Sequence, residues 1–392
     1  MPPRVLVVSH SDLSSDPRVE RQIDALRGLY DVVAAGFRPP RYEDVSFVDI
    51  SIPPPAAGQR ALRFARLLAR RHEAAYWKHP LTVAALDRLR DVPADVAIAN
   101  DISTLPVTLR LGMPVLFDAH EYAPGQAGNR WSWHLLYGPH ASALCRRYIP
   151  RVAAMTTVST SIADEYLRLT DVRPRVVTNA PRRQALEPTC VHEPVRVLHH
   201  GAATPGRGLE EMIRLAGLLD ERFMVDFMLV EDAPGYRASL VERARGNPRI
   251  RFVAPQPMTS LVETANTYDV GLHLLQPRNP NQRYALPNKL FEFIQARLAV
   301  AIGPSPEMAR IVERYRCGVV AADFAPETLA AALNGLDADS IGSLKNASHA
   351  AADELCAEAN VDIVRNAVAD ALAAGSSDQP TDGTAARASS SS

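Results

Sequence analysis

The chain has 392 residues, which is too long for one ordinary α/β core, so we expect two domains. Its content of 47% hydrophobic and 22% charged residues is that of a water-soluble globular protein. The formal net charge of −1 argues against nucleic acid as a partner.

The cysteines and the apolar runs indicate a cytoplasmic protein without a metal centre. The four cysteines are scattered and form no CxxC pair, which argues against a zinc site or a disulfide framework. The apolar run that begins at Val5 is too short for a signal peptide, and no stretch approaches the roughly 18 apolar residues of a membrane span. Peripheral contact with the inner face of the plasma membrane is left open.

The first half of the chain alternates short apolar runs with helical spacing. Because the runs are β-branched and apolar almost throughout, they predict a parallel sheet that is covered on both faces. The predicted strands are Val5–His10, Asp31–Phe37, Asp95–Asp101, Pro114–Glu121, Ala153–Ser159 and Arg175–Pro181.

Gly58–Lys78 is the most strongly amphipathic segment of the chain. Its apolar side chains recur at steps of three and four residues, and arginines occupy much of the remaining circumference. This pattern favours contact with an anionic bilayer, although the same stripe could pack on the N-terminal sheet and leave the arginines solvated. The stripe consists of Leu62, Ala65, Leu68 and Ala69, the arginines are at 60, 63, 66, 70 and 71, and Tyr76 and Trp77 close the segment.

A second alternation begins after the polar segment Arg182–Pro194, which is the predicted linker. We therefore predict two doubly wound α/β domains, residues 1–185 and 186–372, with a final helix that could pack back on the first domain. The tail 373–392 is rich in small polar residues and is expected to be disordered. The predicted strands of the second domain are Val195–Gly201, Met224–Asp232, Arg249–Pro255, Val270–Gln276, Leu298–Gly303 and Cys317–Asp323.

In doubly wound sheets, ligands bind beyond the carboxyl ends of the strands, so polar residues there are the first candidates for a site. No Gly-x-Gly-x-x-Gly motif follows the first strand, which argues against an NAD- or FAD-binding dehydrogenase. The loop carries His10, Asp12 and Asp16 instead. Asp16 precedes a proline and is interpreted mainly as a helix cap, whereas Asp12 fits a surface loop and a substrate contact equally well.

Asp118, His120 and Glu121 form a polar group where the predicted strand Pro114–Glu121 ends. Three polar residues at the end of a buried run favour a functional role over a structural one. Asp101 ends the neighbouring run and would face the same crevice, with a loop start as the alternative.

The second domain offers a cationic site at the corresponding edge. Gly201 begins a turn after the first strand, and Arg207 stands just before a helix, where it could bind phosphate, with an exposed loop arginine as the alternative. Lys289 and Glu292 lie on the first turns of a helix that begins near Asn288. Their spacing suits a diphosphate and a ribose, but an ordinary capped helix would look the same.

At these residues the chain resembles the family 4 glycosyltransferases, of the glycosyl transferases group 1 type. The resemblance covers nearly everything except the tail. It implies the GT-B fold, in which two Rossmann-like domains face each other across a cleft. It also implies a retaining hexosyltransferase (EC 2.4) of bacterial polysaccharide biosynthesis that needs no metal or other cofactor. It rests on "SHSDLSSDPRVERQ", "IANDISTLPV", "VLFDAHEY", "VHEPVRVLHHGAATPGRGLEEM" and "LPNKLFEFIQARLAVAIGPSPEM".

The resemblance also implies roles for the candidate residues. Glu292 would bind the donor ribose, and Lys289 with Arg207 the diphosphate. His120, with Asp118, would act at the transferred sugar. The remaining candidates are Asn288, Gly201 and Leu290 on the donor side and Asp12, His10 and Asp101 on the acceptor side.

Two departures from the family pattern bear on activity. Tyr284 stands where many members carry the first glutamate of an E-x7-E pair, and Ser11–Leu13 replaces a glycine-rich loop.

The function expected from the resemblance is transfer of a sugar from a nucleotide diphosphate sugar to a glycan, a lipid-linked saccharide or a small molecule. A lipid-linked acceptor would explain a membrane-binding segment at 58–78. Two alternatives remain open: a non-catalytic nucleotide-sugar-binding or partner protein, and a nucleotide-sugar epimerase of the same fold.

Overall fold

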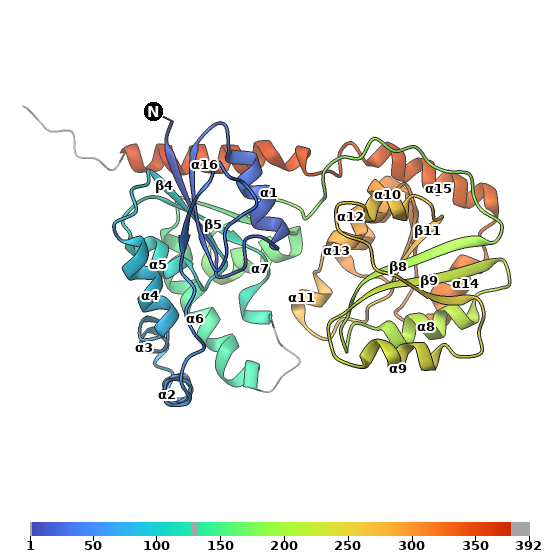
Figure 1. The fold of residues 1–392 in the computed structure, drawn as a ribbon, viewed down its shortest axis with the longest axis horizontal. Coiled ribbons are helices and arrows are strands. Elements are labelled where there is room, and N and C mark those ends of the chain that lie inside the picture. The colour runs from blue at the N-terminus through green and yellow to red at the C-terminus, as the bar shows by residue number, and fades with distance from the viewer. Residues whose placement is uncertain (1, 127–131, 378–392) are drawn as a thin grey trace, which may run out of the picture.

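The computed structural model describes residues 2–126 and 132–377. Figure 1 shows two lobes side by side, each built around a parallel sheet with helices on both faces. The chain passes from the first lobe to the second through 182–194, where no helix or strand forms. The α/β architecture of two doubly wound domains is thereby confirmed.

The described strands of the first domain form a seven-stranded sheet in the order β3-β2-β1-β4-β5-β6-β7, and every pair is parallel. The prediction missed β3, a four-residue edge strand. The strands are β1 Arg4–Val8, β2 Asp31–Gly36, β3 Ser46–Asp49, β4 Val96–Asn100, β5 Val115–Ala119, β6 Ala154–Thr157 and β7 Arg175–Val176.

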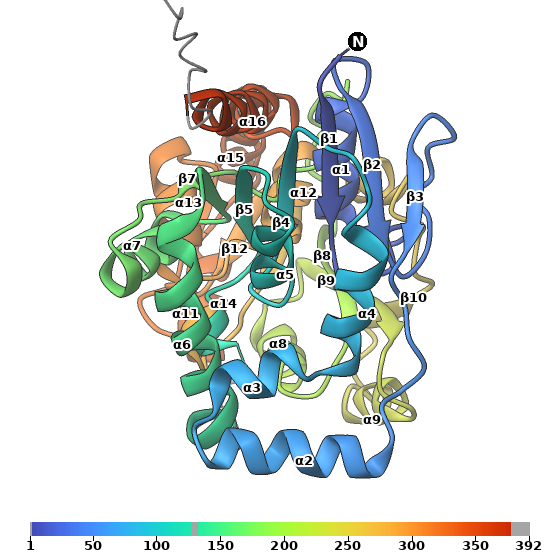
Figure 2. The same ribbon diagram turned by 90° about the vertical axis from the view of Figure 1, so that its left-hand side faces the viewer.

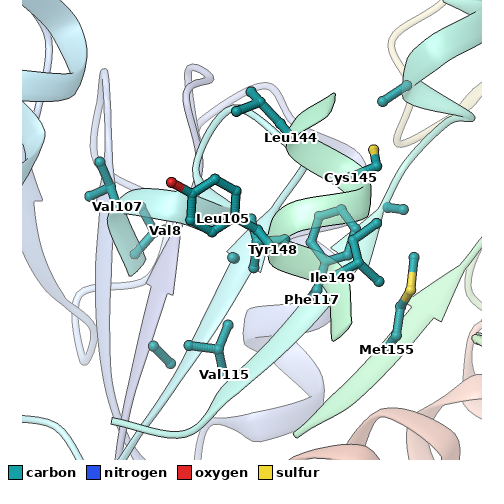
Figure 3. Close-up of a cluster of buried hydrophobic side chains, with 14 of the residues drawn as sticks. Val8, Leu105, Val107, Val115, Phe117, Leu144, Cys145, Tyr148, Ile149 and Met155 are labelled. Atoms are coloured by element: carbon teal, nitrogen blue, oxygen red, sulfur yellow. The ribbon is translucent and has the colours of Figure 1, made fainter. Parts of the chain in front are cut away.

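The helices of the first domain cover both faces of this sheet. Between the sheet and α5 and α6 lies a large apolar cluster, which Figure 3 shows with side chains from β5, α5 and α6. A three-residue 3-10 turn spans Ala123–Gly125, and a π-helical turn spans Trp133–Tyr137. The helices are α1 Pro17–Leu26, α2 Ala57–Leu68, α3 His72–Trp77, α4 Pro80–Leu89, α5 Leu105–Arg110, α6 Gly138–Tyr148 and α7 Thr160–Thr170.

The amphipathic segment 58–78 does not form one helix, because Arg70 adopts a positive φ of 55° between α2 and α3. Leu62 and Leu68 are 51% and 58% exposed, so the interpretation in which the stripe packs on the sheet is wrong for these residues. Tyr76, expected at the membrane interface, is buried, and its hydroxyl donates to the carbonyl of Ser103 at 2.7 Å. Figure 2 shows α2 lying across one end of the molecule.

The described strands of the second domain form a six-stranded parallel sheet in the order β10-β9-β8-β11-β12-β13. Each strand overlaps a predicted one. The strands are β8 Val195–Ala203, β9 Phe223–Glu231, β10 Ile250–Val253, β11 Val270–His273, β12 Ala299–Ile302 and β13 Gly318–Val320.

The final helix, α16, lies along the first domain although it follows the second in the chain (Figure 1). Its residues Val364, Ala367, Val368 and Ala371 belong to the apolar cluster built on β1 and β2. Residues 373–377 continue this helix and were wrongly assigned to the tail, whose remainder lies outside the described residues. The other helices are α8 Leu209–Leu218, α9 Tyr236–Arg243, α10 Leu261–Ala265, α11 Pro280–Arg283, α12 Asn288–Gln295, α13 Pro306–Tyr315, α14 Pro326–Asn334, α15 Ala338–Ala351 and α16 Glu358–Ser377.

The two domains meet through α7, α11 and α13. Glu307, on α13, accepts hydrogen bonds from the amide of Ser161 at 2.9 Å and from that of Thr160 at 3.3 Å, so it caps α7 from the other domain. Tyr284 follows α11 and packs against the apolar cluster of the first domain. These contacts hold the carboxyl ends of the two sheets face to face.

Candidate functional site

A cavity of about 280 Å³ lies between the two domains. Arg207 and Lys289 line it from the second domain, and Glu121 and Gln126 line it from the first. Asn281 bridges the domains here, because its side-chain amide donates to Glu121 at 2.9 Å and its oxygen accepts from the amide of Tyr122 at 2.9 Å. The structure thus brings two of the predicted diphosphate ligands together in one interdomain cavity.

Lys289 is positioned by α12, which begins at Asn288 after Pro287. The helix is anchored by side chains that are buried in the second domain, including Leu290, which is therefore turned away from the cavity. Lys289 Nζ donates to the carbonyl of His200 at 2.9 Å. Gly201 makes room for it: a Cβ there would lie 3.2 Å from Nζ, and the φ of 134° disfavours other residues.

The environment of Lys289 is unusually rich in histidine. His199 and His273 line the cavity, and His200 lies beside it on β8. Burial, then the nearby Lys289, lowers the pKa of His200 to about 3. Burial, then Arg207, lowers the pKa of Lys289 itself to about 8. None of these histidines was predicted as a site residue. His199 and His200 lie within β8, and only His273 stands at the end of its strand, the position that singled out His120.

Arg207 lies in the loop between β8 and α8. Gly206 and Gly208 on either side have φ of 85° and 72°, and a Cβ at Gly208 would lie 2.8 Å from the carbonyl of Leu274. The loop thus requires glycine to turn Arg207 towards the cavity. An anion between Arg207 and Lys289 would relieve the repulsion between these two cations, which contributes to the lowered pKa of Lys289.

Glu292 is 4% exposed and lies one turn along α12 from Lys289. Burial raises its pKa to about 7, although Lys289 and Arg21 oppose the rise. Its Oε2 lies 3.4 Å from His200 Nε2. The described lining of the interdomain cavity includes neither Glu292 nor His120, so the structure does not bring these two residues together with Arg207 and Lys289 in one cavity.

His120 follows β5 and its side chain is 18% exposed. Its backbone amide donates to Asp101 at 3.1 Å, and its Nε2 lies 2.9 Å from the side-chain oxygen of Asn100. Burial alone would lower its pKa, but the carboxylates of Asp101 and Asp118 together raise it. The ring is thus fixed in orientation and biased towards the protonated form.

Asp118 is 2% exposed and is held within the first domain. Arg18 on α1 donates to both of its oxygens at 2.8 and 2.6 Å, and Thr156 donates to it at 2.6 Å. Burial would raise its pKa, but Arg18 and then His120 hold it well below the usual value. Asp118 is therefore an anion. One of its carboxylate oxygens lies 3.5 Å from His120 Nε2, and its side chain is more deeply buried than that of His120.

Replacing Asp118 by asparagine should lower the free energy of unfolding by about 3–5 kcal/mol, because the buried charge of Arg18 would lose its ion-pair partner. Chemical denaturation measures the change. Asp87→Asn is the matched control, since its ion pair with Arg90 is exposed and should contribute about 0–1 kcal/mol. Equal losses in the two variants would contradict the structural importance assigned to the buried pair.

The expected acceptor-side residues fall into different surroundings. His10 lines a second cavity, within the first domain. Asp12 accepts from the amide of Ser14 at 3.0 Å and lies 3.6 Å from Arg38, as a loop residue would. Asp101, whose φ is 62°, supports His120. Asp16 caps α1 by accepting from the amides of Arg18 and Val19, which confirms the helix-cap interpretation.

In the described ranges, no group of three or more His, Cys, Asp or Glu side chains is arranged to hold a metal ion. Over the same residues, no helix has the length and apolar character needed to cross a membrane.

No protein-family model matches the chain, and no curated protein matches it in sequence. Solved structures match it closely in fold. Anabaena HepE in complex with UDP has a TM-score of 0.69 at 12% identity, covering 95% of this chain and 100% of its own. The α,α-trehalose-phosphate synthase (UDP-forming) of Burkholderia vietnamiensis has a TM-score of 0.64 at 12% identity, with coverages of 95% and 100%.

A third similar structure is a mutant of S. aureus TarM in complex with fondaparinux, α-GlcNAc-glycerol and UDP. Its TM-score is 0.69 at 7% identity, covering 93% of this chain and 99% of its own. The matches extend over both domains. The chain has the GT-B fold.

Proposed function

We propose that the chain is a glycosyltransferase that moves a sugar from a nucleotide diphosphate sugar to a saccharide acceptor. The observation that carries the proposal is the interdomain cavity in which Arg207 and Lys289 converge. A leaving nucleoside diphosphate develops negative charge, which the two cations lining this cavity can stabilise. The complexes of HepE and TarM with UDP support a nucleotide donor in this fold.

Within this proposal the domains have separate tasks. The second domain binds the diphosphate through Arg207 and Lys289, with Glu292 accepting from the ribose hydroxyls. The first domain supplies His120 at the sugar, and Asp118 is a positioning residue that orients and charges that ring. Lys289 and Glu292 lie on the first turns of α12, His120 and Asp118 lie at the end of β5, and Arg207 lies in the loop before α8.

The finer steps belong to the same proposal. Transfer would retain the configuration of the sugar, with the acceptor hydroxyl attacking the face that the diphosphate leaves and passing its proton to the departing phosphate. This route uses cations to stabilise the leaving group and requires neither a metal nor a protein nucleophile. It therefore suits the cavity residues Arg207 and Lys289.

The donor half of the proposal can be tested by mass spectrometry of nucleotides retained on the purified protein, together with calorimetry of UDP binding. We expect a nucleoside diphosphate or its sugar conjugate to be retained, and UDP to bind to the wild-type protein. A folded protein that retains none and binds neither UDP nor the other nucleoside diphosphates contradicts it.

A non-catalytic nucleotide-sugar-binding protein is the second candidate, and Tyr284 favours it. The residue takes the place of the family's first glutamate, and its ring packs against the apolar cluster of the first domain. The carbonyl of Tyr284 also accepts from Ser159 Oγ at 3.1 Å. Such a protein would bind the nucleotide sugar but release no sugar with any acceptor, which separates the two candidates.

A cytoplasmic location with contact to an anionic membrane surface forms part of the proposal, and α2 supports it. The helix turns Leu67 inward onto Ala75 and Leu136 and leaves Leu62, Phe64 and Leu68 exposed. Arginines flank these side chains, so the face combines apolar insertion with attraction to anionic headgroups. A lipid-linked saccharide acceptor would be presented at such a surface.

Liposome sedimentation tests the membrane contact. The protein should pellet with anionic liposomes at low salt and less at physiological salt, because screening weakens each arginine contact of about 1 kcal/mol. Leu62→Ser with Leu68→Ser should abolish pelleting. Leu218→Ser, which alters an exposed leucine of α8, is the matched control and should leave it unchanged. Absence of pelleting at both salt concentrations rules the contact out.

A further inference from the structure

A second cavity, of about 360 Å³, lies inside the first domain. It is bounded by α2, α4, α6 and the π-helical turn Trp133–Tyr137, and by the loops that follow β1 and β4. Gln126 lines both this cavity and the interdomain cavity, so the two are neighbours that share a wall. Its volume is within the range of cavities that bind small molecules.

Three polar atoms in the lining of this cavity are buried without a partner. They are Nε2 of His10, Nε of Arg63 and Nδ1 of His140, for which the described part of the chain provides no hydrogen bond. His140 is 6% exposed. An unsatisfied buried polar group is destabilising, and native proteins contain few of them. Three in one cavity indicate a ligand that supplies the missing partners.

The charge within the cavity is positive. Burial, then Arg63 and His72, lowers the pKa of His140 to about 4, and burial, then His79, lowers that of His10 to about 4. Both rings are therefore neutral at physiological pH and can exchange hydrogen bonds with hydroxyl groups. Arg63 remains charged, and a guanidinium binds a carboxylate or a phosphate through paired hydrogen bonds.

Aromatic rings form the apolar walls of the cavity. Trp133 and Tyr137 stack with ring centroids 5.8 Å apart, and His10 stacks on Phe37 at 6.2 Å. The indole of Trp133 is fixed by donating to the carbonyl of Pro124 at 2.9 Å. Flat rings offer the C–H face of a sugar a surface to pack on, while polar groups at the edges bind its hydroxyls.

We propose that this cavity binds a sugar residue of the acceptor that carries an acidic group. Arg63 binds the carboxylate or phosphate, His10 and His140 bind hydroxyls, and Trp133 with Tyr137 flanks the ring. The inference rests on the proposed function, because it makes the cavity the acceptor side of the transfer site. Arg63 lies on α2, the helix whose exposed leucines are the proposed membrane contact. An acceptor held at a membrane surface would therefore lie close to Arg63.

The test is calorimetric titration of the full chain with methyl glucuronide, glucose 1-phosphate and methyl glucoside, in the presence of UDP so that the interdomain cavity is occupied. An acidic probe should bind at least about tenfold more tightly than the glucoside, since charge-assisted hydrogen bonds are the stronger ones. The better acidic probe shows whether the acid is a carboxylate or a phosphate.

Arg63→Gln should remove this preference, whereas Arg60→Gln, which alters an exposed arginine of the same helix outside the cavity lining, should preserve it. Equal binding of acidic and neutral probes by the wild-type protein, or a preference that survives Arg63→Gln, overturns the inference. Titration with UDP alone tests the donor site separately. If UDP binds but the acidic preference is absent, the cavity inference fails and the donor proposal stands. A wild-type protein that keeps the acidic preference without binding UDP would contradict the donor proposal and leave the cavity assignment intact.

Discussion

Replacing His120 by alanine should lower the turnover number by about 100-fold or more and leave the affinity for UDP within about threefold. The removal of one preorganised group that acts on developing charge typically costs this much. Asn100 and Asp101 fix the ring, and the carboxylates of Asp101 and Asp118 raise its pKa. Steady-state kinetics with a radiolabelled donor measure the first quantity, and calorimetry measures the second.

The matched control for this prediction is His349→Ala, which removes a partly exposed histidine of α15 beside Glu187. It should have near-normal turnover. If His120→Ala also retains near-normal turnover while folding normally, the histidine is a structural residue of the strand end. If instead UDP affinity falls as far as turnover, His120 contributes to nucleotide binding rather than to the transfer step.

Replacing Lys289 by alanine should weaken UDP binding by about 10- to 150-fold, which corresponds to the roughly 1.5–3 kcal/mol of a charge-assisted hydrogen bond. Glu292→Ala should weaken it to a similar extent through the lost ribose contact. Calorimetry checks both variants. If both variants bind UDP as tightly as the wild-type protein does, α12 does not form part of the donor site.

Lys289 also gives the donor affinity a dependence on pH. Because its pKa is lowered to about 8, the ammonium is charged below pH 8 and loses its proton as the pH rises through that value. UDP affinity of the wild-type protein should therefore fall between about pH 7.5 and about 9.5. Lys289→Arg is the control, since arginine stays charged and should flatten this dependence. An equal fall in both proteins would show that another group titrates.

The alternation of apolar runs was sufficient to predict both sheets. Parallel strands buried on both faces are apolar along their whole length, so β8, β9 and β12 can be recognised without knowing their neighbours. The strand β3 could not, because it is a four-residue edge strand with exposed ends. The helix cap at Asp16 was predictable because it depends only on the residues next to it.

The face that an amphipathic helix buries was not predictable from the pattern. The spacing of Leu62, Leu68 and their neighbours defines a stripe but not its partner, and α2 buries Leu67 while leaving that stripe exposed. The end of α2 at Arg70 was not predictable either, because no sequence pattern marks an arginine that adopts a positive φ.

The candidate site was predictable where a charged residue stands near the start of a helix. Arg207 and Lys289 were recognised from their places at helix starts, and they converge on one cavity. The histidines of β8 and β11 were passed over because they sit in runs that otherwise look like strand interior. The second cavity could not be foreseen, since it draws Arg63, Trp133 and His140 from segments far apart in the chain.

The most direct measurement of the central claim is transfer from a panel of radiolabelled nucleotide diphosphate sugars to a bacterial lipid extract, with the released nucleoside diphosphate quantified in parallel. Sugar transfer should require the acceptor, release one nucleoside diphosphate for each sugar transferred, and be lost in His120→Ala. Nucleotide binding without sugar release from any donor, with or without acceptor, would contradict a transferase.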